Sequence, residues 1–180
     1  MNAANKITLL RIILLPLLVV FLMQDRTLYN WLALTIFLLA AATDWLDGYI
    51  ARSSNEVTVL GKLLDPVADK LLFLAVLLPL VRREVVPDWM AILLLGREFL
   101  VSGLRSVASS EGAIIAAGTL GKYKMGFSIS AVSCLIVGGW FTLPGHILLW
   151  VTLGLSLVSG AQYFYSYRHY LRTSGTKSSD

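Results

Sequence analysis

Six predominantly apolar stretches follow one another along the chain, and the polar connections between them are short. A helix needs about 20 apolar residues to cross the hydrocarbon core of a bilayer, and soluble domains rarely maintain runs of that length. Hydrophobic residues make up 57% of the 180 residues and charged residues only 14%, with a mean hydropathy of +0.73. We therefore predict an all-α integral membrane protein with six transmembrane helices, at residues 7–23, 31–51, 61–81, 88–108, 122–141 and 146–170.

Residues 1–171 are predicted to form a single polytopic membrane domain, because every connection between the apolar stretches is short. Lys6 and Arg11 before the first stretch resemble the start of a signal peptide. No small-residue cleavage site follows, so this segment is expected to be retained. Residues 172–180 are polar and poor in hydrophobic side chains, which predicts a short disordered tail.

Basic residues are distributed unevenly between the two predicted membrane faces. If both termini face the cytoplasm, all of the 15 Lys and Arg residues except Arg26, Arg82 and Arg83 lie on or toward the cytoplasmic side. This distribution satisfies the positive-inside rule and predicts a multi-pass protein of the bacterial cytoplasmic (inner) membrane. The net charge of +4 does not indicate nucleic-acid binding, since the basic residues form no continuous basic stripe.

Four aspartates, Asp44, Asp47, Asp65 and Asp69, lie inside apolar sequence within 26 residues. An ionised carboxylate in a membrane span costs at least ~2.5 kcal/mol, so four of them require a compensating partner. A pair of divalent cations is the partner that this cluster predicts. The alternative is a proton or cation pathway in a small ion transporter, which also concentrates carboxylates inside a helical bundle.

Helical spacing places these aspartates beside small residues on two facing surfaces. The short connection predicts antiparallel neighbours, with both acidic surfaces near the cytoplasmic end. Pro66 either kinks the second helix or begins it, with Asp65 as the preceding cap. The surfaces consist of Asp44, Asp47, Gly48 and Ala51 in the first helix and Gly61, Asp65, Ala68 and Asp69 in the second.

Carboxylate oxygens without nearby His or Cys favour a hard cation, Mg²⁺ or Mn²⁺, over zinc or copper. Two such ions roughly neutralise four aspartates, and paired metals typically clamp the oxygens of a phosphoryl group during in-line displacement. Gly48, Ala51 and Gly61 leave room for a phosphate beside the backbone, and Arg52 offers a planar fork of donors to it.

The pattern DxxDGxxAR, eight residues, GxxxDxxxD at positions 44–69 resembles the signature of the CDP-alcohol phosphotransferases. The resemblance covers essentially the whole chain, since six spans on 180 residues are also similar to that family. Within the family, Asn5-x-x-Thr8-x-x-Arg11 and Gly96-Arg97-Glu98 are most similar to bacterial members that use glycerol 3-phosphate. The resemblance implies the family fold and a homodimer.

The resemblance also implies a reaction and roles for the site residues. CDP-diacylglycerol would give its phosphatidyl group to sn-glycerol 3-phosphate and release CMP, with Asp69 as general base. Asp44, Asp47 and Asp65 would hold the first metal, and Asp47, Asp65 and Asp69 the second. Gly48, Arg52, Thr58 and Gly61 would contact the CDP part, with Asn5 and Thr8 as further candidates whose alternative role is capping of a helix start.

The acceptor of this reaction carries its own phosphate and needs permanent cations. Four basic residues near the same membrane face are candidates, although topology signals or lipid headgroup contacts are alternative roles for them. Glu98 is interpreted as the ion-pair partner of a neighbouring charge, and Cys134 and His146 as packing and interfacial residues. The four acceptor candidates are Arg97, Arg105, Lys122 and Lys124.

Other functions remain open at the level of sequence. A sibling transferase would use another acceptor, such as inositol phosphate or serine, with the same aspartate cluster. A small ion transporter and a non-catalytic lipid-binding membrane protein are more distant alternatives. The favoured hypothesis is a phosphatidyltransferase with two metal ions, both termini and its active site facing the cytoplasm.

Overall fold

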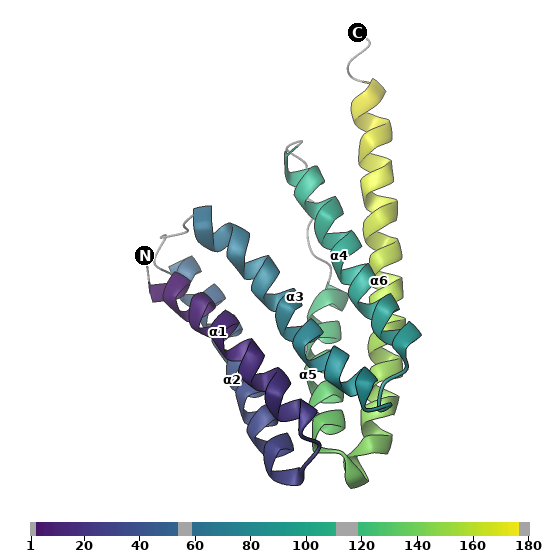
Figure 1. Ribbon diagram of the computed structural model, residues 1–180. Coiled ribbons are helices and arrows are strands. Elements are labelled where there is room, and N and C mark those ends of the chain that lie inside the picture. The colour runs from purple at the N-terminus through teal and green to yellow at the C-terminus, as the bar shows by residue number, and fades with distance from the viewer. Residues whose placement is uncertain (1–2, 54–58, 111–118, 177–180) are drawn as a thin grey trace.

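The computed structural model describes residues 3–53, 59–110 and 119–176, and these residues form an all-helical bundle (Figure 1). The predicted all-α class and the number of helices are confirmed for this part of the chain. A short 3-10 helix, η1 (Gly139–Phe141), precedes the last helix. The six α-helices are α1 (Ala3–Met23), α2 (Thr27–Ser53), α3 (Val59–Arg82), α4 (Asp88–Ser110), α5 (Thr119–Val137) and α6 (Thr142–Thr176).

The helix bounds differ from the predicted ones where local chemistry opposes or allows continuation. α5 ends at Val137 and not at residue 141, because Gly138 and Gly139 have φ values of 72° and 57°, a conformation that glycine tolerates and that interrupts a helix. α6 continues to Thr176, so the predicted disorder is wrong for residues 172–176. Extending an existing helix avoids the cost of nucleation, which explains this continuation through polar residues.

Two open questions about helix starts are settled by the backbone. α3 begins at Val59, so Pro66 lies inside that helix and does not start it after a cap at Asp65. α1 begins at Ala3, so Asn5 and Thr8 lie within the helix and are not residues that precede it. The capping alternative for Asn5 and Thr8 is therefore wrong, since an N-cap residue stands outside the helical turns.

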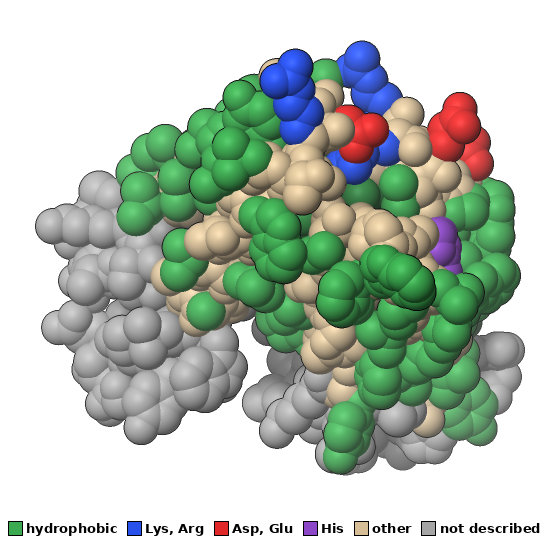
Figure 2. Space-filling model, turned by 90° about the horizontal axis from the view of Figure 1, so that it is seen from below, with side chains coloured by type: hydrophobic (Ala, Val, Ile, Leu, Met, Phe, Trp, Pro, Cys, Tyr) green, Lys and Arg blue, Asp and Glu red, His purple; other side chains and the backbone are tan. Residues whose placement is uncertain are grey.

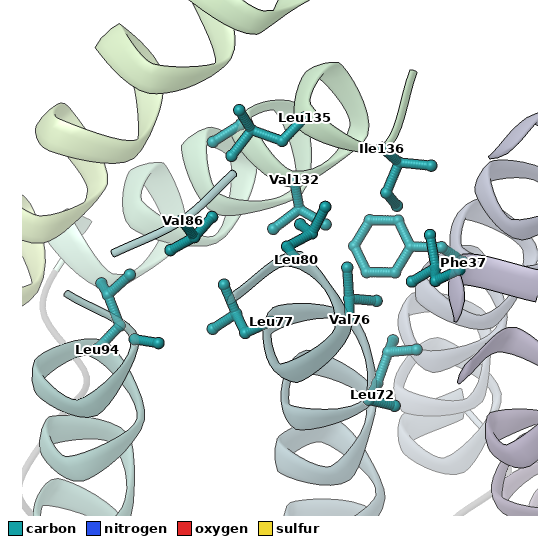
Figure 3. Packing of buried hydrophobic residues seen from close by; sticks show 14 of the residues in the cluster. Phe37, Leu72, Val76, Leu77, Leu80, Val86, Leu94, Val132, Leu135 and Ile136 are labelled. Carbon is teal, nitrogen blue, oxygen red and sulfur yellow. The ribbon is translucent and has the colours of Figure 1, made fainter. Parts of the chain in front are cut away.

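The helices pack so that α3 lies among α1, α2, α4 and α5, while α6 packs against α5 and α4. Their apolar faces meet in one hydrophobic core, in which side chains from α2, α3, α4 and α5 point toward one another (Figure 3). Phe37, Val76, Leu80, Val132 and Ile136 are each buried there. In α2 and α3 this core lies toward the ends away from the aspartates, so it forms an apolar base below them.

Polar contacts tie the loops at this apolar end. Arg83, which follows α3, donates to the Oδ1 of Asn30 at 3.0 Å and forms an ion pair with Asp25, which precedes α2. The Nε2 of His146 lies 2.7 Å from the Val85 carbonyl oxygen and its Nδ1 lies 2.9 Å from that of Thr142. These contacts join the α1–α2 and α3–α4 connections to each other and to α6. Seen from this end, the charged side chains gather along one edge (Figure 2).

The membrane prediction is supported only in part by the helices themselves. Among the described residues, one helix, Gly139–Tyr167, is long and apolar enough to cross a membrane by length and composition. Shorter apolar segments are found at residues 8–23, 27–43 and 123–137. Large apolar side chains nevertheless stand exposed on several helices, among them Ile13, Ile92, Leu100 and Trp150. The six predicted spans therefore stay a prediction.

The close approach of α5 and α6 at Gly145 generates a stability prediction. A Cβ at this position would lie 2.8 Å from Leu135 Cδ2 and 3.1 Å from Cys134 Cβ, closer than carbon atoms approach. We expect Gly145→Ala to destabilise the protein by about 1–3 kcal/mol, the usual cost of overpacking. Gly154→Ala is the matched control on the same helix, because nothing lies within 4 Å of its added Cβ.

Removal of a helical glycine at position 154 should stabilise the fold by about 0.5–1 kcal/mol. Thermal unfolding of the two purified variants in the same detergent measures the difference. Equal melting temperatures for the two variants would contradict the described packing of α5 on α6.

Candidate active site

The four aspartates lie on two neighbouring helices, as the sequence predicts. α2 contains Asp44 and Asp47, and α3 contains Asp65 and Asp69. Because α2 ends at Ser53 and α3 begins at Val59, these acidic segments lie toward the same end of the bundle (Figure 1). The helical placement of the motif is confirmed, and both helices are packed against each other.

Most side chains of this motif lie outside the described residues, as does Thr58 altogether. The side chain of Asp69 is described and is partly buried on α3, three residues before the buried Leu72 in the sequence. The metal and nucleotide roles of the remaining members stay predictions. Those members are Asn5, Asp44, Asp47, Gly48, Arg52, Thr58, Gly61 and Asp65.

Within the described ranges, no group of three His, Cys, Asp or Glu side chains is placed to hold a metal ion. Asp69 is the one motif aspartate whose side chain belongs to those ranges. The chemistry of the donor set nevertheless fits a hard cation, because the four motif ligands are all carboxylates. Cys134 and His146, which would favour a softer metal, belong to the last turn of α5 and the beginning of α6.

α1 contributes a polar surface that sequence reasoning identified only in part. Thr8 and Arg11, one turn apart, are 1% and 2% exposed, which makes Arg11 one of the largest fully buried side chains. A permanently charged guanidinium is buried at low cost only where anions or hydrogen-bond acceptors surround it. The sequence signal is the pattern Asn5-x-x-Thr8-x-x-Arg11, in which site roles are predicted for Asn5 and Thr8 but not for Arg11.

The register between α1 and α3 places this polar surface near the aspartates. The two helices pack together and run in the same direction (Figure 1), and the ion pair between Asp25 and Arg83 joins the residues that follow their C-terminal ends. Counting back along both helices from these joined ends, with equal rise per residue, places Arg11 at about the level of Asp69. Arg11 is therefore a further candidate for the site that the aspartates are predicted to form.

Helices α4 and α5 meet in a charged cluster formed by Glu98, Arg97 and Lys124, and α6 joins it through Ser159. Glu98 Oε1 accepts a hydrogen bond from Arg97 at 2.9 Å and also pairs with Lys124 of α5. The second terminal nitrogen of Arg97 donates to Ser159 Oγ of α6 at 2.7 Å. The interpretation of Glu98 as an ion-pair partner is confirmed, and the structure brings two of the four acceptor candidates together.

Of the other two acceptor candidates, the side chain of Arg105 is described and that of Lys122 is not. Arg105 lies two turns beyond Arg97 on α4, with its guanidinium 5.8 Å from the centroid of the Tyr163 ring. The side chain of Lys122 lies outside the described residues. Sequence reasoning missed Tyr163 and Ser159 as members of this surface, because serine and tyrosine in an apolar helix give no sign of which neighbour they face.

This cationic region has an excess of positive charge. Among the described side chains, Arg97, Arg105 and Lys124 carry three positive charges and Glu98 one negative charge, and Lys122 on α5 adds a fourth positive charge. The Tyr163 hydroxyl, the Ser156 hydroxyl and Arg97 Nε are buried and lack a hydrogen-bond partner within the described part of the chain. Such polar groups between α4 and α6 are suited to a phosphate and its attached alcohol.

Two helices that carry aspartates, together with a cationic cluster in the same bundle, are features expected of an enzyme that transfers a phosphate-linked group. A model of the CDP-alcohol phosphatidyltransferase family matches residues 1–158, and the chain belongs to this family.

Curated relatives extend the similarity over nearly the whole chain. Each of the following is named CDP-diacylglycerol–glycerol-3-phosphate 3-phosphatidyltransferase. The chain is 39% identical to the Bacillus subtilis (strain 168) protein, over 96% of its own length and 98% of the relative. It is 37% identical to the protein of Rickettsia bellii (strain RML369-C), over 94% and 97%. It is also 37% identical to that of Pseudomonas fluorescens, over 98% and 95%.

The contact between Arg97 and α6 depends on the absence of a side chain at Gly160. A Cβ there would lie 3.1 Å from Arg97 Nε, so Gly160→Ala should push the guanidinium away from Ser159. We expect a loss of about 1 kcal/mol, the typical value of one hydrogen bond. A double-mutant cycle with Ser159→Ala, measured by thermal unfolding, tests whether this loss comes from the hydrogen bond between Arg97 and Ser159.

If the two changes disrupt the same hydrogen bond, Ser159→Ala should cost much less in the Gly160→Ala background than in the wild type. Additive losses would contradict the described position of Arg97.

Proposed function

We propose that this protein transfers the phosphatidyl group of CDP-diacylglycerol to sn-glycerol 3-phosphate, which yields phosphatidylglycerophosphate and CMP. The observation that carries the proposal is the 39% identity, over 96% of the chain, to a relative named for this reaction. The intact motif from Asp44 to Asp69 supports the same assignment, because it supplies the carboxylates that the chemistry requires.

The reaction exchanges one phosphorus–oxygen bond for another. A hydroxyl oxygen of glycerol 3-phosphate attacks the phosphorus that bears the diacylglycerol group, and the bond from that phosphorus to the CMP oxygen breaks. Asp69 takes the hydroxyl proton, and the electron pair of the broken bond leaves with CMP. A carboxylate performs this role when the hydroxyl lies within ~3 Å or is reached through one water.

Two divalent cations, Mg²⁺ or Mn²⁺, are the cofactors that the donor set fits. When bound, they offset the charge of the diphosphate and of the aspartates. Asp44, Asp47 and Asp65 would hold the first ion, and Asp47, Asp65 and Asp69 the second. The family membership and the all-carboxylate donor set support this assignment.

The donor nucleotide is assigned to the region between α1, α2 and the start of α3. Gly48 and Gly61 leave space for the diphosphate beside the backbone, and Arg52 offers a bidentate fork to a phosphate. Thr58, Asn5 and Thr8 complete the set as polar contacts to the CDP part. The burial of Thr8 on the polar surface of α1 supports a role inside the bundle.

The acceptor phosphate is assigned to Arg97, Arg105, Lys122 and Lys124. These four cations outnumber the one carboxylate of Glu98, and a phosphate monoester carries about −1.5 to −2 at pH 7. A zwitterionic acceptor such as serine would leave these cations uncompensated. The charge therefore favours a phosphorylated alcohol, and the named relatives favour glycerol 3-phosphate over inositol phosphate.

Both substrates meet at a membrane surface, since one is a lipid and the other is water-soluble. The protein is accordingly a multi-pass enzyme of the bacterial cytoplasmic membrane, in contact with membrane lipid, with both termini and the active site on the cytoplasmic side. The uneven distribution of basic residues and the exposed apolar side chains support this placement. A homodimer is the assembly that we assign to it.

A panel of acceptors tests the function directly. Purified protein with CDP-diacylglycerol and Mg²⁺ should release CMP with glycerol 3-phosphate, and release with inositol phosphate or serine should be at least about 100-fold slower, the scale expected when a site's buried polar groups lose their partners. Release with another acceptor alone would reassign the protein to a sibling transferase. No release with any acceptor would favour an ion transporter or a non-catalytic lipid-binding protein.

The role of Asp69 is tested by Asp69→Asn. This change removes the base and one metal ligand, so turnover should fall by at least about 10³-fold, while CDP-diacylglycerol binding persists through the remaining ligands. Asp88→Asn is the matched control, because Asp88 accepts from the Trp89 backbone N–H at the start of α4 and Asn caps helices equally well. Measurable turnover near the wild-type rate in Asp69→Asn would refute the base assignment.

A further inference from the structure

Glu98 stands at the centre of the cationic region, yet the proposed reaction gives it no role. Its carboxylate is the shared partner of Arg97 from its own helix and Lys124 from α5. A carboxylate this close to a site for an anionic substrate repels that substrate. Its presence there therefore requires another explanation. The geometry of its contacts indicates what that explanation is.

Both cations meet the same oxygen of Glu98. Arg97 and Lys124 each pair with Oε1, so this atom fixes the two cations relative to each other. Arg97 is held from its other side by Ser159, whose hydroxyl in turn donates to the Ser156 carbonyl oxygen at 3.2 Å. The chain of contacts therefore runs from α5 through α4 to α6, and Glu98 is its junction.

The side chains that Glu98 holds are long and flexible in the absence of a partner. Lys and Arg side chains have many rotamers, and a ligand that must order them loses affinity because their conformational entropy falls on binding. Arg97 and Lys124 also repel each other once the intervening negative charge is removed. Glu98 thus orders both cations before a phosphate arrives.

We propose that Glu98 is a positioning residue of the acceptor site, which holds Arg97 and Lys124 ready for the phosphate of the acceptor. This inference rests on the proposed function, since it assigns Arg97 and Lys124 to the acceptor. The role assigned to Glu98 requires no contact with the reacting phosphorus or the attacking hydroxyl. Its effect is on acceptor affinity.

Glu98→Gln tests the proposal, because it keeps the shape of the side chain and removes the charge. The KM for glycerol 3-phosphate should rise about tenfold, with less than about a twofold change in the KM for CDP-diacylglycerol and in kcat. Glu98→Asp retains the charge on a shorter side chain and should restore part of the acceptor affinity. Glu84→Gln, the same chemical change on an exposed residue after α3, is the matched control and should leave all three parameters unchanged.

A double-mutant cycle tests whether Glu98 acts through Lys124. Lys124→Met should raise the acceptor KM strongly in the wild type and much less in the Glu98→Gln background, since in that background Lys124 is no longer held in place. If Glu98→Gln does not fold, Glu98→Asp takes its place in the cycle, because it keeps the charge but shortens the side chain that holds Lys124. Additive effects in the cycle would overturn the proposal.

A binding measurement separates this inference from the proposed function. Glycerol 3-phosphate at saturating concentration should raise the melting temperature of the wild-type protein, and Glu98→Gln should lose most of that shift. Failure of the proposed function is seen in the wild type, as absence of CMP release with glycerol 3-phosphate. An unchanged or lowered acceptor KM in Glu98→Gln, or an undiminished thermal shift, would overturn the role of Glu98.

Discussion

Charged side chains inside an apolar helical bundle must be neutralised by other parts of the same protein, and this requirement organises the structure. The interior has little water to solvate an ion, so an unpaired charge there would cost several kcal/mol. Glu98 meets this requirement for Arg97 and Lys124, and at the loop end of the bundle Arg83 pairs with the exposed Asp25 and with Asn30. Each of these groupings joins segments that are distant in sequence, so the pairing of charges also helps to select which helices become neighbours.

The hydrophobic core and the polar groups of the candidate site occupy different halves of the bundle along its length. The half with the α1–α2 and α3–α4 connections is filled with close-packed aliphatic and aromatic side chains, such as Phe37, Leu80 and Ile136. The other half contains the aspartate motif, the buried Arg11 and the cationic region. The same helices pass through both halves, so the polar groups stand on elements that the hydrophobic core holds rigid. A transfer reaction in which oxygen and phosphorus must be aligned benefits from such support.

The sequence predicted the number of helices, the acidic motif on two adjacent helices and the pairing of Glu98, because these depend on composition and local spacing. It did not predict Arg11 as part of the site, since a periodic pattern shows that a residue lies on one face but not what that face meets. Ser159 and Tyr163 escaped notice for the same reason. The end of α5 at Gly138 and the extension of α6 to Thr176 depend on backbone conformation and helix propagation, which hydropathy does not measure.

The ion pair between Arg83 and Asp25 lies at the end of the bundle opposite the aspartate motif. Fourteen residues of helix separate Arg83 from Asp69, which corresponds to about 21 Å at 1.5 Å per residue. With α2 and α3 joined near that end by the hydrogen bond from Arg83 to Asn30, a change of about 5° in the angle between them displaces their opposite ends by about 2 Å, whereas metal–ligand distances at the proposed site would tolerate about 0.2 Å. The contacts at the loop end of the bundle therefore affect how accurately the aspartates of α2 and α3 can converge on a shared ion.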